Sequence, residues 1–248
     1  MIPCISVANM RESDRKTIEN RVPGLTLMYR AATGVFRASD WDGETVIAVG
    51  GGNNGGDGFA LACILQKEGH ACRVVTLSEH LSADSAHFAA KAKLLGVPVS
   101  AYVPGVFSGS DTIVDCLLGT GFAGEVRKPY RTAIEEMNAS DARVISVDIP
   151  SGMNGDTGEA STAVRSDLTV TIGFVKNGLV QDRAGSCMSR LVVADIGIEL
   201  DREENWICDP RERTEKPLTH ENVFSAPAWL EIEPIDVRTV SYAPEAEA

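Results

Sequence analysis

The chain has 248 residues, of which 44% are hydrophobic and 23% are charged, as is typical of a globular domain. Its formal net charge of −12 disfavours a nucleic-acid-binding surface, because phosphate backbones bind to basic surfaces. No stretch approaches the roughly 18 consecutive apolar residues of a membrane span. The composition therefore predicts a protein with neither nucleic acid nor membrane as a partner.

The six cysteines include no CxxC pair, and the four histidines show no metal-ligand spacing. Three of the cysteines lie in apolar runs. The N-terminus carries no signal-peptide pattern. We therefore expect reduced cysteines in the core of a cytoplasmic protein.

Two helices are predicted over Ser6–Arg37, with Asp14 on the water-facing side of the first. A buried strand, Val46–Val49, then runs into the glycine- and asparagine-rich stretch Gly50–Gly58, and a helix follows from Phe59. Glycines permit positive φ angles and close approach of a ligand, and the start of a helix attracts anions. This stretch therefore predicts an anion site, the alternative being a tight turn that only packs the helix on the sheet.

Strands and helices alternate along the rest of the chain. Further strands are expected at Cys72–Thr76, Val97–Tyr102, Thr112–Leu118, Arg143–Val147, Leu168–Ile172 and Leu191–Ala194, and helices at Phe59–Glu68, Ala83–Leu95 and Lys128–Asn138. This alternation predicts an α/β fold with a parallel sheet covered on both faces. We assign residues 1–200 to this domain and 201–248 to a charged, Pro-containing tail or linker. Trp206, Phe224 and Trp229 are candidates for docking that segment onto the domain.

Three loops with small and polar residues follow strands: Gly50–Gly58, Gly119–Glu125 and Asp148–Ser151. Ligands bind in the crevice at the carboxyl ends of the strands in such sheets. The three loops together predict one binding site, more strongly than any of them would alone.

Asp115 lies within a predicted buried strand, where an unpaired carboxylate is costly and needs a partner or a cation. Asn54, Asp115 and Ser151 together offer hard oxygen ligands that suit an alkali or alkaline-earth ion. The alternative is that backbone N–H groups of the glycine loop satisfy Asp115.

Asp148 lies at the exit of its strand, where its carboxylate can face the crevice and act as an acid or a base. The alternative for Asp148 is a turn-forming role. Lys176 stands before Asn-Gly, a setting more typical of a solvated turn residue, and is a lesser candidate for reaching a ligand phosphate.

The sequence Gly50–Gly55 also satisfies the G-x-G-x-x-G pattern of dinucleotide-binding dehydrogenases. Glu79 would then be the acidic residue after the second strand. Two consecutive asparagines place polar side chains where a pyrophosphate turn usually has small residues. A dehydrogenase also leaves the other two polar loops unexplained, so we regard it as the weaker interpretation.

Three segments carry a resemblance to a known family. They read GGGNNGGDGFALA, VDCLLGTGFAGEVRKP and VDIPSGMNGDTG, and together with flanking segments the likeness extends over Ile5–Ile198. The chain resembles the NAD(P)HX epimerases, the YjeF N-terminal domain family. The resemblance implies a Rossmann-like three-layer α/β/α sandwich with a mostly parallel central sheet, usually assembled as a homodimer.

The resemblance also implies an activity, the interconversion of the R and S forms of hydrated NADH and NADPH (NADHX and NADPHX) at C6 of the nicotinamide ring. A separate ADP- or ATP-dependent dehydratase that is specific for the S form would then restore the cofactor. The alternative is a non-catalytic nucleotide- or protein-binding scaffold module on the same fold.

Site residues follow from the resemblance, motif by motif. The implied substrate-binding residues are Asn53, Asn54, Gly55, Gly56, Asp57, Gly119, Thr120, Gly121, Phe122, Ala123, Gly124, Glu125 and Asp148. Asn54, Asp115 and Ser151 would hold a potassium ion, and Asp148 would be the acid/base group. Asp57 is also compatible with capping the helix that follows the glycine turn.

Overall fold

The computed structural model describes residues 1–208, 223–227 and 229–243. Its α-helices are α1 (Val7–Asn20), α2 (Gly24–Arg37), α3 (Asn53–Lys67), α4 (Ala83–Leu94) and α5 (Tyr130–Ala139), with 3₁₀ helices η1 (Asn177–Val180) and η2 (Asp182–Ser186). Its strands are β1 (Ile2–Ile5), β2 (Thr45–Val49), β3 (Cys72–Thr76), β4 (Val99–Ala101), β5 (Thr112–Cys116), β6 (Arg143–Val147), β7 (Leu168–Ile172), β8 (Val175–Lys176), β9 (Leu191–Asp195), β10 (Asn205–Cys208), β11 (Val223–Ser225) and β12 (Ile232–Asp236).

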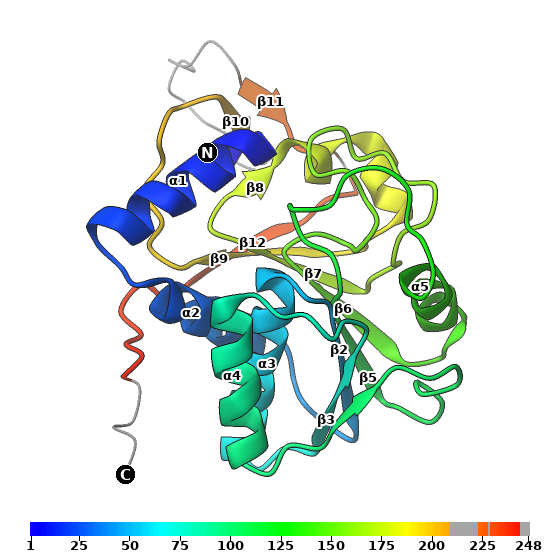
Figure 1. Ribbon diagram of the computed structural model, residues 1–248. Helices are drawn as coiled ribbons and strands as arrows, with labels where there is room; N and C mark the ends of the chain where they lie inside the picture. The colour runs from blue at the N-terminus through cyan, green and yellow to red at the C-terminus, as the bar shows by residue number, and fades with distance from the viewer. Residues whose placement is uncertain (209–222, 228, 244–248) are drawn as a thin grey trace.

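Eight of the described strands form one parallel sheet in the order β12-β9-β7-β6-β5-β2-β3-β4. From β2 the chain first adds β3 and β4 on one side and then crosses to β5 on the other side (Figure 1). The order of the strands therefore reverses between β2 and β5. A crevice opens at such a switch point, beyond the carboxyl ends of the two strands.

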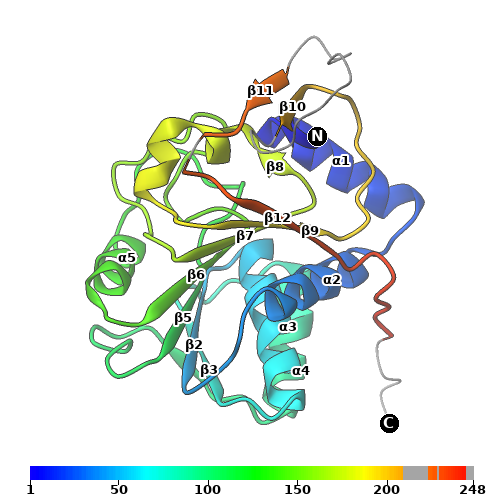
Figure 2. The ribbon, with the colours of Figure 1, turned by 180° about the vertical axis from the view of Figure 1, so that it is seen from behind.

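The alternation of side chains in β2 explains the three layers. Ile47 and Val49 belong to the core that is shared with α2, α3 and α4, whereas Val46 and Ala48 belong to the core beneath α5. Successive residues of a strand point to opposite faces, so each face is covered by its own helices. Figures 1 and 2 show α2, α3 and α4 together on one face and α5 on the other. The expected Rossmann-like α/β/α sandwich is confirmed.

A second, four-stranded sheet has the order β11-β10-β1-β8. The sequence patterns did not indicate β1 or β8, which are short. β1 pairs in parallel with β8, joining Ile5 to Lys176, and it pairs antiparallel with β10. This small sheet brings the N-terminus and β8 together beside the main sheet.

The described residues of the segment 201–248 are built into both sheets. β10 and β11 complete the small sheet, and β12 pairs in parallel with β9 at the edge of the main sheet. Trp229 packs against a core cluster that includes Leu179 and Ala184. We expected this segment to be a tail or linker, but it supplies an edge strand of the main sheet. Its charged and Pro-containing sequence gives no clear strand pattern.

The helix after β2 begins at Asn53, earlier than the Phe59 start expected from the sequence. None of the glycines between residues 50 and 58 has a positive φ angle. A Cβ atom on Gly55 would lie 2.1 Å from the carbonyl oxygen of Gly50, and one on Gly58 would lie 2.8 Å from Val49 Cγ1. These glycines are therefore needed for close packing of α3 on β2, as in the packing alternative, rather than for a left-handed turn.

The five cysteines whose side chains the structure describes are buried and free, as we expected from the sequence: Cys4, Cys63, Cys72, Cys116 and Cys187. The side chain of Cys208 lies outside the described part of the chain. No helix in the described ranges is long and apolar enough to cross a membrane.

Candidate functional site

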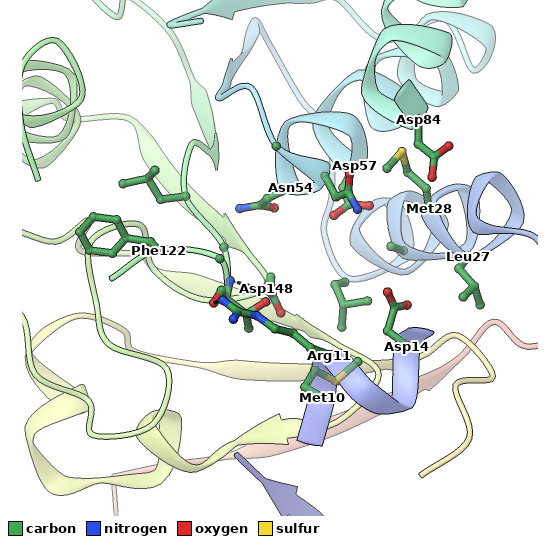
Figure 3. A pocket seen from close by; sticks show the side chains of 18 of the residues that line it. Met10, Arg11, Asp14, Leu27, Met28, Asn54, Asp57, Asp84, Phe122 and Asp148 are labelled. Atoms are coloured by element: carbon green, nitrogen blue, oxygen red, sulfur yellow. Dashed lines mark hydrogen bonds between the residues drawn. The ribbon is translucent and has the colours of Figure 1, made fainter. Parts of the chain in front are cut away.

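A cavity of about 690 Å³ lies at the carboxyl ends of the central strands, between the loops that follow β2, β5 and β6 (Figure 3). Its lining includes these predicted site residues: Asn53, Asn54, Asp57, Gly119, Thr120, Gly121, Phe122, Ala123 and Asp148. The switch point between β2 and β5 explains this position. The crevice predicted from three separate loops is thus a single pocket.

The start of α3 forms one wall of the pocket. The Ser82 hydroxyl donates a hydrogen bond of 2.7 Å to Oδ1 of Asn53, whereas both amide atoms of Asn54 are buried and have no hydrogen-bond partner among the described residues. Leaving a buried amide unpaired costs about 1–3 kcal/mol, so such a group calls for a ligand or an ion. Gly55 and Gly56 follow in the same helix but are buried and lie outside the pocket lining.

Asp115, in the middle of the sheet, is fully buried and accepts four hydrogen bonds. Its Oδ1 accepts from Leu117 N (3.2 Å) and Ser151 Oγ (2.5 Å), and its Oδ2 accepts from Ser146 Oγ (2.8 Å) and Ser151 N (2.9 Å). Burial raises the pKa of this carboxyl, and the hydrogen bonds from Ser151 oppose that shift. Protein donors thus bind Asp115, but they are the hydroxyls of Ser146 and Ser151 and the N–H groups of Leu117 and Ser151, and none is an N–H group of the glycine loop.

The proposed ion ligands surround one short segment, Leu117–Gly119. Ser151 Oγ accepts a hydrogen bond of 2.8 Å from Leu118 N. A Cβ atom on Gly119 would lie 3.2 Å from Cβ of Asn54. No cationic side chain in the described ranges forms an ion pair with Asp115. A buried carboxylate without a countercharge and an orphaned amide oxygen are a set of hard oxygen donors that fits an alkali or alkaline-earth ion.

Asp148 forms the floor of the pocket together with Lys176. The Lys176 ammonium is 1% exposed and donates to Asp148 Oδ1 (2.6 Å), Ile172 O (2.7 Å) and Thr171 Oγ1 (3.0 Å). Oδ2 of Asp148 accepts a hydrogen bond of 3.1 Å from Thr120 N. Lys176 is therefore a buried partner of Asp148, and the interpretation of it as a solvated turn residue is wrong.

The backbone at Asp148 is in the left-handed region, with a φ angle of 73°. A non-glycine residue adopts this conformation at some cost, and such residues concentrate at functional sites. The conformation turns the chain sharply at the end of β6, and the carboxylate faces the pocket (Figure 3). The sequence left two interpretations of Asp148 open, a turn-forming residue or a carboxylate that faces the crevice. The structure shows both features.

The loop Gly119–Glu125 divides between two cavities. Gly119–Ala123 line the main pocket, and Phe122, Ala123 and Gly124 line a neighbouring cavity of about 680 Å³. Glu125 is exposed and lies outside both linings. The part of the loop nearest to β5 is thus the part that meets the pocket.

Three further carboxylates from three helices line the pocket: Asp14 (α1), Asp57 (α3) and Asp84 (α4). Burial, followed by repulsion from Asp148 and Asp14, raises the pKa of Asp57 well above its usual value. Burial also raises the pKa of Asp14, which the sequence pattern had placed on the water-facing side of its helix. Asp57 lies in the second turn of α3, so it is not the cap of that helix.

The α1 helix supplies residues that the sequence analysis did not identify. Met10, Arg11 and Asp14 all line the pocket, and Arg11 Nη2 donates a hydrogen bond of 2.7 Å to Thr120 O (Figure 3). The spacing of Met10 and Asp14, one helical turn apart, places them on one face of α1. The spacing can be read from the sequence. That these residues line a pocket is known only from the packing of α1 in the structure.

Fold and site together define a Rossmann-like α/β protein with a nucleotide-sized pocket at the switch point of its parallel sheet. The family model described as YjeF-related protein N-terminus matches residues 24–178. The chain belongs to this family.

Curated relatives match most of the chain. An NAD(P)H-hydrate epimerase of Limosilactobacillus fermentum is 37% identical over 202 residues, covering 77% of this chain and 95% of the relative. An NAD(P)H-hydrate epimerase of Rhodopirellula baltica is 35% identical over 211 residues, covering 81% of this chain and 86% of the relative. The bifunctional NAD(P)H-hydrate repair enzyme Nnr of Pyrobaculum aerophilum is 37% identical over 213 residues, which cover 80% of this chain but 42% of that protein.

The crystal structure of yeast ynu0 (YNL200c) superimposes with a TM-score of 0.65. It covers 74% of this chain and 85% of the yeast chain at 22% sequence identity. At that identity the likeness concerns the fold alone. The agreement supports the α/β fold described above.

Proposed function

We propose that this chain is an NAD(P)H-hydrate epimerase that interconverts the R and S forms of NADHX and NADPHX. The observation that carries the proposal is the pair formed by Asp148 and Lys176 at the floor of a nucleotide-sized pocket. Relatives that match nearly their whole length bear the name of this enzyme. No feature of the described structure favours the non-catalytic scaffold module.

Asp148 is our choice for the acid/base group. Its carboxylate faces the pocket, and its two oxygens are fixed by Lys176 Nζ and Thr120 N. Placed against C6 of the hydrated ring, the protonated carboxyl gives its proton to the C6 hydroxyl group, which departs as water, and the carboxylate takes a proton back from the water that adds. The lone pair of the ring nitrogen stabilises the planar, iminium-like intermediate, and return of water to the other face gives the other epimer.

The walls of the pocket hold the rest of the substrate. The start of α3, at Asn53 and Asn54, presents backbone N–H groups and the positive end of a helix dipole, and the loop Gly119–Ala123 lines the pocket beside it. N–H groups at the start of a helix favour an anion such as phosphate. We assign the nucleotide's phosphate end to these two segments.

Asn54, Asp115 and Ser151 would hold a potassium ion. When bound, the ion would supply positive charge that stabilises the buried Asp115 carboxylate and fixes the loops after β2, β5 and β6. The protein already connects two of these loops without an ion, because Ser151 Oγ donates to Asp115 and accepts from Leu118 N. The identity of the ion as potassium is part of the proposal.

The repair pathway implies a partner enzyme, because epimerisation alone does not restore the cofactor. We propose that a separate dehydratase that is specific for the S form acts on the product. The bifunctional relative, of which this chain spans 42%, supports a link between two activities. A homodimer and a cytoplasmic location stay predictions from the sequence.

A coupled assay tests the function. Mixed R and S NADHX is incubated with an S-specific dehydratase and its nucleotide, with and without this protein. Without an epimerase, rapid repair stops when the S form is used up. With this protein, repair is expected to run to completion. If the R form persists while the nucleotide still binds, the chain is a binding module.

A further inference from the structure

Arg11 differs from the other cation of the pocket lining in having no carboxylate partner. All three N–H groups of the Lys176 ammonium donate hydrogen bonds, to Asp148, Thr171 and Ile172. Among the described contacts, Arg11 makes one hydrogen bond, to Thr120 O at 2.7 Å, and no ion pair. One turn further along α1, Arg15 is paired with Glu12 and Glu19 instead. The guanidinium of Arg11 therefore keeps N–H groups available for an anionic ligand.

The charge distribution restricts where an anion can lie in this pocket. Asp14, Asp57 and Asp84 line it, and no protein donor in the described part of the chain contacts their carboxylates. A phosphate near them would meet like charge, which raises its free energy. The loop at Thr120 lies beside the free cation of Arg11 and the start of α3. The carboxylate that this loop contacts, Asp148, already has Lys176 as its countercharge.

We propose that Arg11 binds the pyrophosphate of the dinucleotide and draws α1 onto the loop at Thr120. The inference rests on the proposed function, which supplies a substrate with a pyrophosphate. An arginine fork matches phosphate oxygens with two parallel hydrogen bonds, so it holds a phosphate in a fixed orientation. The uncharged, hydroxyl-bearing parts of the substrate then face Asp14, Asp57 and Asp84.

Thr120 connects this contact to the reacting end of the substrate. Its carbonyl oxygen accepts from Arg11, and its N–H group donates to Asp148 Oδ2. A ligand held at Arg11 therefore acts on the same residue that positions the acid/base carboxylate. Arg11 is thus a binding residue whose loss weakens affinity more than it slows the reacting complex.

The test compares R11Q and R11K with the matched control R15Q, an exposed arginine on the same helix. We expect R11Q to raise KM for NADHX about tenfold, with kcat changed less than about threefold, because charged hydrogen bonds to one phosphate are lost. R11K, which keeps the charge without the fork, should recover part of this loss. R15Q should behave as the unmodified protein does.

A second measurement separates this inference from the proposed function. ADP-ribose carries the pyrophosphate but no nicotinamide, and its Kd is measured for each variant by calorimetry. We expect R11Q to weaken ADP-ribose binding about tenfold even if the chain proves catalytically silent. Equal affinity of R11Q and the unmodified protein would overturn the assignment. So would a fall in kcat at constant KM, or failure of the unmodified protein to bind ADP-ribose.

Discussion

Nζ of Lys176 lies 2.6 Å from Oδ1 of Asp148, and the two side chains are 1% and 13% exposed. They come from different parts of the fold, β8 in the small sheet and the turn after β6 in the main sheet. The ion pair therefore joins the two sheets at the floor of the pocket. A buried pair of this kind fixes the geometry of a site, although it is not by itself a large source of stability.

Replacing Lys176 tests the importance of this pair. K176M removes the cation and leaves the Asp148 carboxylate without its countercharge, with only the hydrogen bond from Thr120 N. We therefore expect the free energy of unfolding to fall by about 3 kcal/mol. Urea unfolding at neutral pH measures the change, and K93M, at an exposed position of α4, is the control. If the two variants have the same free energy of unfolding, the Lys176–Asp148 ion pair does not contribute to stability.

Asn54 provides a test of the cation. At about ten times its Kd, a bound potassium ion stabilises the folded state by about 1.4 kcal/mol. For a chain of this size that raises Tm by about 3–6 °C. We expect this rise in potassium chloride relative to choline chloride of equal concentration, and its loss in N54A.

The control for this measurement is N53A, because Asn53 is the neighbouring asparagine and its amide already has a partner in Ser82. N53A should keep the response to potassium. Identical Tm values of the unmodified protein in potassium and choline salts would contradict the proposed potassium site.

Asp57 makes stability depend on pH. Its pKa in the folded state is raised well above the usual value of an aspartate, chiefly by burial, so the folded state binds the proton more tightly than the unfolded state does. Its contribution to stability is fully present below about pH 4 and is lost as the pH rises through the folded-state pKa. Each pH unit between the two pKa values corresponds to about 1.4 kcal/mol.

The variant D57N has no titrating group at this position. It should therefore match the unmodified protein near pH 4 and become more stable than it as the pH approaches neutrality. Urea midpoints measured across this range, with the exposed D141N as a reference, would show the divergence. A gap that narrows with rising pH would contradict a raised pKa at Asp57.

The central strands and their polar loops could be predicted because their signals are local. Thr112–Cys116 and Arg143–Val147 are apolar runs that end in small polar residues, and parallel strands bring such ends to one edge. The same rule brings Asn54 and Asp148 to one pocket.

Lys176 could not be predicted because its environment is made by distant residues. In the sequence it precedes Asn-Gly and looks solvated, whereas pairing of β8 with β1 buries it. Arg11 and Asp14 were missed for the same reason, since a polar helix face looks solvent-exposed until the pocket beside it is known. The start of α3 was misplaced because glycines that permit close packing resemble glycines of a turn.

Oxygen exchange distinguishes two routes of epimerisation. If the C6 hydroxyl group departs and water returns, epimerisation in ¹⁸O-labelled water must place label at C6 as fast as the epimers interconvert. Mass spectrometry of NADHX during the reaction measures this label, with a protein-free sample to correct for spontaneous exchange. Interconversion that outruns labelling would mean that the ring nitrogen–C6 bond opens instead, and the iminium-like intermediate would be wrong.

The most direct test of the account follows purified S-NADHX as it converts to the R form, with the unmodified protein and with D148N. The amide of the variant still accepts a hydrogen bond from Thr120 N but cannot transfer the proton. We predict rapid conversion by the unmodified protein and a kcat at least about a hundredfold lower for D148N, with ADP-ribose binding largely retained. Conversion by D148N at an unchanged rate would remove Asp148 from the chemistry, and no acceleration by the unmodified protein would contradict the epimerase itself.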